Sequence, residues 1–153
     1  MTFSLSAVTE DVSVKDLPCI LAFVEDACQL ANVNPDLFFD LQLATEEACT
    51  NVIEHAYKGQ GGALRILFET RNDDVLITLH DHGRAFDPNA VSPPNTSLPL
   101  RQRPVGGLGL HLIYRLMDDV RFSFGPEGNT LLMVKRNAIA QAPATLEGEE
   151  ADG

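Results

Sequence analysis

Two alternating segments joined by a short polar turn decide most of the architecture open to this chain. Both segments place an apolar side chain at every second position, at Leu64, Ile66 and Phe68 and again at Val75, Ile77 and Leu79. The tetrad Arg-Asn-Asp-Asp at 71–74 is typical of a chain reversal. A period of two on either side of such a turn predicts an antiparallel hairpin with one buried face.

The remaining periodicities predict what lies beside this hairpin. Helical spacing runs from about 14 to 31 and from about 36 to 57, and a shorter helix is predicted at 108–117. Alternation predicts further strands at 2–7, 120–124 and 130–135. Helices and strands do not alternate strictly, which predicts an α+β fold. We expect a two-layer sandwich, with a mixed, mainly antiparallel sheet of about five strands and helices on one face.

Two stretches lack periodicity and set the expected domain limits. Residues 89–105 contain prolines at 93, 94, 99 and 104, and a structureless segment of this length is typical of a lid or binding loop. Residues 137–153 carry four acidic and no basic residues, so we expect a disordered acidic tail. One folded domain is therefore predicted over 1–136.

Charge narrows the possible partners. The 153 residues include 11 Lys and Arg against 22 Asp and Glu, a net charge of -11. This balance argues against nucleic-acid binding and against docking to anionic membranes. A polyanion such as a nucleotide would need a divalent cation and backbone N–H groups to hold its phosphates.

The cysteines and the amino-terminal residues bear on the compartment. The chain contains no apolar run long enough to span a membrane and no signal-like amino-terminal segment. Cys19, Cys28 and Cys49 lack metal-type spacing and lie in apolar helical patterns. We expect all three to be buried, reduced thiols in the cytoplasm.

A carboxylate and an amide lie one turn apart on the second predicted helix. Glu47 and Asn51 point to the same side, beside an apolar stripe. A carboxylate can accept a proton, and an amide oxygen can ligate a hard cation such as Mg²⁺. The alternative is an ordinary hydrogen-bonded helix pair. Glu46 points about 100° away around the helix, so we expect it to be solvated.

A second candidate lies where the hairpin ends. Asp81 closes the predicted strand, and Gly83 follows two residues later. An aspartate there can accept from an exocyclic amine, and a glycine lets a flat ring approach the backbone. Both residue types are also common where a strand simply turns, so the pair alone is a weak signal.

Glycines also precede the last helix and the last strand. Gly106, Gly107 and Gly109 stand at the start of an apolar helix, where free N–H groups and the helix dipole bind anions. This is neither a P-loop nor a Rossmann fingerprint, and the alternative is a flexible helix entry. Gly128 and Asn129 are explained by a hairpin turn, which leaves only the Thr130 hydroxyl as a polar contact.

The order and spacing of these motifs resemble the GHKL superfamily of ATPases. Residues 47–51 resemble its N box, 81–88 and 106–110 its two glycine boxes, and 128–130 its terminal Gly-x-Thr. The continuation Val-Ile-Glu-His-Ala-Tyr at 52–57 and the run at 106–113 are similar to small bacterial anti-sigma-factor serine kinases of the RsbW type. The resemblance covers about 1–136. It implies the GHKL (Bergerat) ATP-binding fold, with 89–105 as the ATP lid.

The resemblance also implies a role for each matching residue. Asn51 would ligate a Mg²⁺ ion that bridges the ATP phosphates, and Glu47 would be the general base for a serine hydroxyl. Asp81 would accept from the adenine amine, Gly83 would admit the ring, and Thr130 would support that contact. The rest of the nucleotide site would come from Phe86, Gly106, Gly107 and Gly109.

Two lid arginines and one departure from the family pattern complete the comparison of motifs. Arg101 and Arg103 in the lid would offset phosphate charge, meet an acidic partner or remain solvated. Glu54 stands where histidine kinases often carry Lys, which argues against histidine-kinase chemistry.

The implied function is phosphoryl transfer from Mg·ATP to a serine or threonine of a STAS-type anti-sigma-factor antagonist. The chain would also sequester a sigma factor or another regulator, and it would form a homodimer without direct contact to nucleic acid or membrane. Two alternatives remain open. One is an ATP-gated binding module without significant kinase activity, and the other is a partner-switching kinase with a non-sigma target such as secretion.

Overall fold

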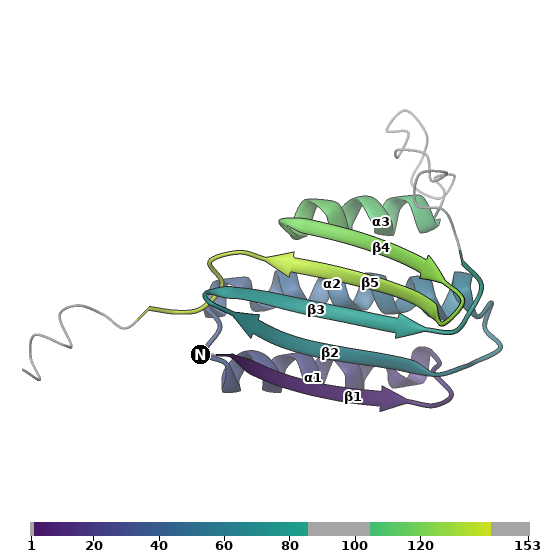
Figure 1. Cartoon of the computed structure of the whole chain (residues 1–153), viewed down its shortest axis with the longest axis horizontal. Coiled ribbons are helices and arrows are strands. Elements are labelled where there is room, and N and C mark those ends of the chain that lie inside the picture. Colours follow the sequence, from purple (N-terminus) through teal and green to yellow (C-terminus); the bar gives the residue numbers. More distant parts are fainter. Residues whose placement is uncertain (1, 86–104, 142–153) are drawn as a thin grey trace, which may run out of the picture.

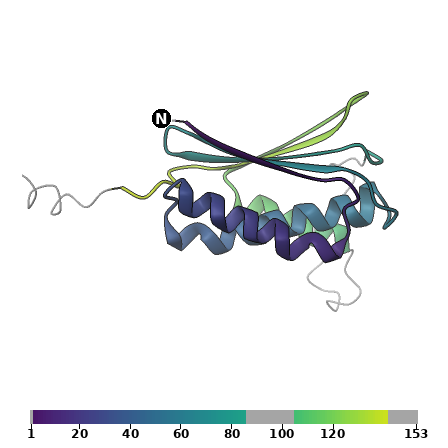
Figure 2. The same cartoon turned by 90° about the horizontal axis from the view of Figure 1, so that it is seen from below.

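The computed structural model describes residues 2–85 and 105–141, and the side chains of the last helix from Leu110 onward. They form two layers, a five-stranded sheet with all of its described helices on one face (Figures 1 and 2). The strands are β1 (Phe3–Thr9), β2 (Leu64–Arg71), β3 (Asp74–Asp81), β4 (Asp119–Gly125) and β5 (Gly128–Lys135). The helices are α1 (Leu17–Leu30), α2 (Phe38–Asn51) and α3 (Val105–Leu116), with single turns η1 (Val14–Asp16) and η2 (Pro35–Leu37) and a π-helix, η3 (Val52–Ala56).

The sheet has the order β1-β2-β3-β5-β4. Every described pairing is antiparallel, so the sheet is wholly antiparallel rather than mixed. The predicted hairpin is confirmed, because β2 pairs with β3 in a register that joins Arg71 to Asp74 across the turn. The α+β sandwich with helices on one face is confirmed as well.

Local signals at the helix starts account for where α1 and α2 begin. Ser13 and Asp16 form a capping box, in which the Ser13 N–H donates to the Asp16 carboxylate at 2.9 Å. The Asn34 side chain accepts from the Asp36 N–H at 3.0 Å, with Pro35 at the first position of the turn. Both starts follow from residues that the sequence displays.

The core lies between the inner face of the sheet and the apolar stripes of the helices. Its strand residues include Leu64, Ile66, Phe68, Val75, Ile77, Leu79 and Met133. The helices contribute Ile20, Val24, Ala27, Leu41, Ala44 and Ala48. Burial of this apolar surface is the main force that fixes α2 against β3.

The predicted helix at 36–57 changes character at its end. It is α-helical only to Asn51 and continues as the π-helix η3, whose Tyr57 N–H donates to the Val52 carbonyl at 2.9 Å. Such short π segments are rare and are frequent at functional sites. Helical periodicity cannot distinguish them from a continuing α-helix.

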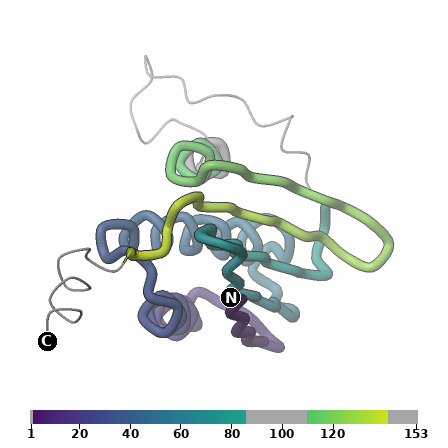
Figure 3. Tube along the Cα trace, turned by 60° about the vertical axis from the view of Figure 1, so that its left-hand side comes forward, coloured from purple at the N-terminus to yellow at the C-terminus, as the bar shows by residue number. Residues whose placement is uncertain are grey.

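The described contacts of the domain extend past the predicted limit at 136. The backbone of Asn34 donates to Ala138 O at 2.7 Å, and Ala140 donates to Asn32 O at 2.8 Å. Ala138 is fully buried, and this segment lies against the α1–α2 connection (Figure 3). Residues 137–141 therefore belong to the domain, and 142–153 lie outside the described residues.

The cysteine expectation is confirmed in part. Cys28 and Cys49 are buried, but Cys19 is exposed near the start of α1. Helical spacing placed Cys19 beside the apolar stripe, but the side chain falls on the solvent side of α1. In the parts that the structure describes, no helix is both long and apolar enough to cross a bilayer.

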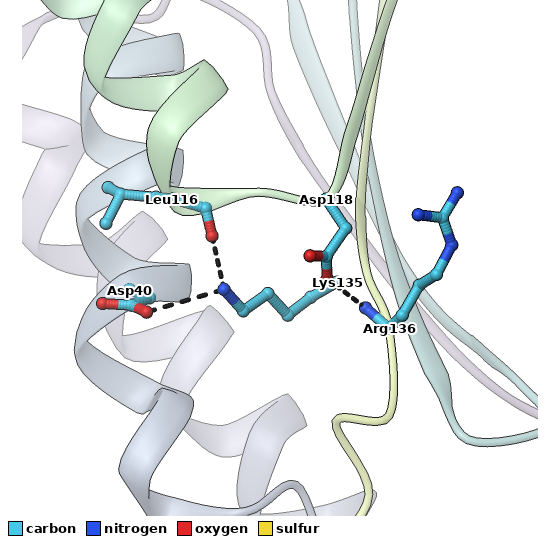
Figure 4. Close-up of polar contacts among 5 residues, drawn as sticks. All are labelled: Asp40, Leu116, Asp118, Lys135 and Arg136. Atoms are coloured by element: carbon cyan, nitrogen blue, oxygen red, sulfur yellow. Dashed lines mark hydrogen bonds and ion pairs between the residues drawn. The ribbon is translucent and has the colours of Figure 1, made fainter.

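A half-buried lysine holds the carboxyl-terminal end of α3. Lys135 on β5 donates to the carbonyl of Leu116, the last residue of α3, and pairs with Asp40 of α2 at 3.6 Å (Figure 4). A cation at this end of a helix satisfies a free carbonyl and complements the helix dipole. Lys135 thus fixes α3 against both the sheet and α2.

Candidate active site

A pocket opens between the carboxyl-terminal half of α2, the end of β3 and the β4–β5 hairpin. Its walls come from Ala48, Asn51, Val52, Leu79, Asp81, Phe122, Phe124, Asn129, Thr130 and Leu131. The structure therefore brings three predicted residues, Asn51, Asp81 and Thr130, to one cavity.

The helix side of this pocket carries the predicted amide, Asn51, and the predicted carboxylate lies one turn before it on α2. Asn51 is largely buried, lines the pocket and receives no side-chain hydrogen bond from the described part of the chain. Glu47 lies one turn earlier on the same face. Partial burial, together with the charges of Glu46 and Glu54, raises the pKa of Glu47 above its ordinary value. A carboxylate whose proton affinity is raised is better suited to act as a base.

The opposite wall carries Asp81. Its Oδ1 accepts from the Gly83 N–H at 2.8 Å and from the Asn129 side chain at 2.8 Å. Only 5% of the Asp81 residue is exposed. Both bonds go to one oxygen, so Oδ2 is left without a donor among the described residues. It is the oxygen that a ligand in the pocket can reach.

The turn after Asp81 is held by three successive backbone N–H groups. His82 donates to the Tyr57 hydroxyl at 2.8 Å, Gly83 donates to Asp81, and Arg84 donates to the Ala56 carbonyl at 2.8 Å. Tyr57 in turn donates to the carbonyl of Ala63. The end of the π-helix thus sets the position of the strand end.

Gly83 is required for space at this contact. A Cβ at Gly83 would lie 2.6 Å from the Ala56 carbonyl oxygen and 2.8 Å from the Ala56 Cβ. The sequence interpretation assigned the glycine to a flat ligand ring approaching the backbone. In the structure, the close approach is that of the π-helix.

Asn129 is a site residue that sequence reasoning missed. Its Nδ2 donates to Asp81 Oδ1 and, at 3.0 Å, to the Gly83 carbonyl. The expectation that Thr130 alone adds a polar contact is therefore wrong, because Asn129 bonds to Asp81 and lines the same pocket. The Thr130 hydroxyl pairs with His80 Nδ1 at 3.0 Å. Strand alternation was the available signal, since Asn129 shares its inward face with the apolar Leu131 and Met133.

Two aromatic rings complete the apolar wall. Phe122 and Phe124 on β4 are stacked, with centroids 6.1 Å apart and planes at 15°. Alternation predicted the strand but assigned neither ring to a site. Rings of this kind offer a surface against which a flat heterocycle can pack.

Other predicted residues fall outside the pocket as described. Gly106, Gly107 and Gly109 lie inside α3, which begins at Val105 rather than after the glycines. The first N–H groups of a helix lack partners within it, so this end can still bind an anion. Phe86, Arg101, Arg103 and most of the predicted lid lie outside the described residues.

The chain is similar in sequence to known proteins. A family model described as the histidine kinase-like ATPase domain matches residues 12–135. Serine-protein kinase RsbW of Bacillus cereus (strain AH187) is 42% identical over 100 residues, which cover 63% of this chain and 62% of that protein. RsbW of Bacillus thuringiensis (strain Al Hakam) is 41% identical over the same shares. The match therefore spans less than two thirds of the length of these curated relatives.

Solved structures share the fold at lower identity. The RsbU and RsbW domains of a Mycobacterium tuberculosis protein match with a TM-score of 0.63 and 16% identity, over 91% of this chain and 35% of that one. The SiaB–SiaC complex of Pseudomonas aeruginosa contains a chain that matches with a TM-score of 0.57 and 17% identity, over 88% of both chains. The residues matched by the family model include Glu47, Asn51, Asp81 and Asn129. Because this match covers most of the chain, the chain belongs to the family of histidine kinase-like ATPase domains.

Proposed function

We propose that this protein is an ATP-dependent protein-serine/threonine kinase of a partner-switching module. The observation that carries the proposal is the pairing of Glu47, whose pKa is raised, with Asn51 one turn later at the wall of a pocket that ends on Asp81. Similarity to the RsbW serine-protein kinases supports the same reading. The acceptor would be a serine of a STAS-type anti-sigma-factor antagonist.

The pocket residues fit a purine nucleotide. Asp81 presents an accessible carboxylate oxygen for an exocyclic amine, and the Phe122 and Phe124 rings form an apolar wall beside it. The start of α3, which contains Gly106, Gly107 and Gly109 in its first turns, would supply N–H groups for phosphate. An acidic chain can thus hold one ATP through local contacts, despite its net charge of -11.

The donor set also fits Mg²⁺. The Asn51 side chain lines the pocket without a protein partner among the described residues, and an amide oxygen is a ligand that Mg²⁺ accepts. The ion, when bound, would neutralise charge on the transferring phosphoryl group. Asn51 would hold it.

Glu47 would act on the incoming serine. Its carboxylate would accept the hydroxyl proton as the serine oxygen attacks the terminal phosphorus and the bond to the ADP oxygen breaks. The carboxyls of Glu46 and Glu54 and partial burial raise the proton affinity of Glu47, which favours this transfer. Positioning and charge neutralisation would supply the rest of the rate enhancement.

The partner side of the proposal comes from the relatives. We infer that the chain sequesters a sigma factor or another regulator on a surface apart from the pocket, and that it acts as a homodimer. The free, buried Cys28 and Cys49 fit a reducing compartment, so we place the protein in the cytoplasm.

The test is a transfer assay with a matched pair of variants. Purified STAS-domain proteins of the source organism are incubated with the kinase and γ-labelled ATP, each also as serine-to-alanine variants. We expect label on one serine, and Glu47→Gln should lower the rate about 10²- to 10⁴-fold, the usual contribution of a general base. Glu46→Gln is the comparison variant: it removes only a neighbouring charge that raises the Glu47 pKa, so it should lower the rate far less than Glu47→Gln. Bound ATP without any phosphoprotein would instead favour the ATP-gated binding module.

A further inference from the structure

The orientation of the Asn129 amide is fixed by its neighbours. Nδ2 lies 2.8 Å from Asp81 Oδ1 and 3.0 Å from the Gly83 carbonyl oxygen. A carboxylate and a carbonyl can only accept hydrogen bonds, so the atom that faces both must be the amide nitrogen. The flipped amide would place oxygen against two oxygens.

This orientation leaves the amide oxygen for the pocket. Asn129 Oδ1 accepts no hydrogen bond from the described part of the chain. Every fully buried side-chain oxygen in that part has a hydrogen-bond partner, so Oδ1 is not fully buried. The residue is only 8% exposed, and it lines the pocket. Oδ1 is therefore an acceptor that the cavity can reach.

The neighbouring threonine offers no proton to the same cavity. His80 Nε2 faces the Glu127 carbonyl at 3.1 Å, so in the neutral ring this nitrogen carries the hydrogen. His80 Nδ1 is then an acceptor, and the Thr130 hydroxyl at 3.0 Å donates to it. The Thr130 hydroxyl therefore donates its hydrogen to His80 and not to a ligand in the pocket.

The polar wall of the pocket at the end of β3 and the start of β5 consequently presents acceptors. They are Asp81 Oδ2 and Asn129 Oδ1, and they belong to side chains joined by a direct hydrogen bond. A ligand edge that carries hydrogen-bond donors can bond to both acceptors of this wall. An edge that carries a carbonyl oxygen would meet two further oxygens.

We propose that Asn129 is a specificity-determining residue, whose Oδ1 and the Asp81 Oδ2 each accept one hydrogen of the exocyclic amine of a bound purine. The inference rests on the proposed ATP site and extends it. It assigns the choice between 6-amino and 6-oxo purines to Asn129 together with Asp81, and it removes the Thr130 hydroxyl from that choice.

The first experiment measures dissociation constants of ATP and ITP by calorimetry on wild type, Asn129→Leu and Thr130→Val. ITP carries a carbonyl where ATP carries the amine. Loss of one hydrogen bond is worth about tenfold in affinity. We expect Asn129→Leu to reduce the preference for ATP over ITP about tenfold, whereas Thr130→Val keeps the wild-type preference. An unchanged preference in Asn129→Leu, or a preference that moves only in Thr130→Val, overturns the proposal.

The second experiment needs no variant, so it holds even if Asn129→Leu fails to fold. Wild-type protein is titrated with ATP, N6-methyl-ATP and N6,N6-dimethyl-ATP. Two acceptors predict a stepwise loss, about tenfold for each hydrogen replaced. If N6-methyl-ATP binds as tightly as ATP, only one hydrogen is read and the role of Asn129 is refuted. Failure of wild type to bind ATP at all would remove the proposed function as well, which separates the two failures.

Discussion

The substitution Gly83→Ala tests the contact between the π-helix and the strand end directly. A Cβ at this position would lie 2.6 Å from Ala56 O, 2.7 Å from Ala56 C and 2.8 Å from Ala56 Cβ. Two of these three atoms belong to the backbone of η3, so no flexible side chain can move aside. The Arg84 N–H bond to the Ala56 carbonyl holds the same backbone in place.

The magnitude follows from this geometry. Gly83 does not have a left-handed φ, so alanine brings no backbone strain of its own. Overpacking of a well-packed contact typically costs about 1–3 kcal/mol. Because the turn that moves carries Asp81 and His82, we also expect weaker ATP binding than the loss of stability alone would cause.

The assay is urea unfolding followed by circular dichroism, with Gly125→Ala as the matched control. A Cβ at Gly125 would meet nothing within 4 Å, so the control should change the free energy of unfolding by less than about 0.5 kcal/mol. Gly83→Ala should lower it by about 1–3 kcal/mol with an unchanged m value. Equal free energies of unfolding for the two variants would refute the packing account of Gly83.

Three further predictions concern other parts of the molecule. Lys135→Met should lower the free energy of unfolding by about 1–2 kcal/mol, because the Leu116 carbonyl loses a charged donor. Arg121→Met, which breaks the exposed pair with Asp119, should change it by less than about 0.5 kcal/mol, and equal effects would contradict the anchoring role of Lys135. Native protein should react quickly with a thiol reagent only at the exposed Cys19, since burial raises the pKa of Cys28 and of Cys49 to about 12. Fast reaction of all three cysteines would contradict the packing of α1 and α2. Glu47→Gln should raise the melting temperature at neutral pH, because a raised pKa in the fold makes ionisation of Glu47 destabilising. This gain should disappear as the pH falls below the ordinary glutamate pKa. A gain in melting temperature that persists in acid would contradict the prediction.

The parts of the fold that local sequence controls could be predicted. The β2–β3 hairpin follows from alternation around 71–74, and the start of α1 follows from the Ser13 capping box. Asn51 and Asp81 could be identified because each carries a polar group at the edge of an apolar pattern. The packing of α2 against β3 then brings them to one pocket.

The parts that depend on contacts between distant residues could not be predicted. Asn129 follows a glycine at a hairpin, so its sequence context explains it without a site. Its role appears only through hydrogen bonds to Asp81 and Gly83, which lie 48 and 46 positions earlier. The π-helix and the buried Ala138 also depend on distant residues. The Arg84 N–H donates to the Ala56 carbonyl at the end of the π-helix, and the Ala138 N–H donates to the Asp73 carbonyl.

The most direct test of the account is the binding of Mg·ATP to wild type and to Asp81→Asn, measured by calorimetry. Asparagine keeps the size and an acceptor for Gly83, but it removes the charge that the ligand amine would meet. Loss of a hydrogen bond to a charged group predicts an affinity about 10- to 100-fold weaker, with circular dichroism confirming that the variant is folded. An Asp81→Asn variant that is folded and binds ATP as tightly as wild type would contradict the assignment of this pocket to the nucleotide.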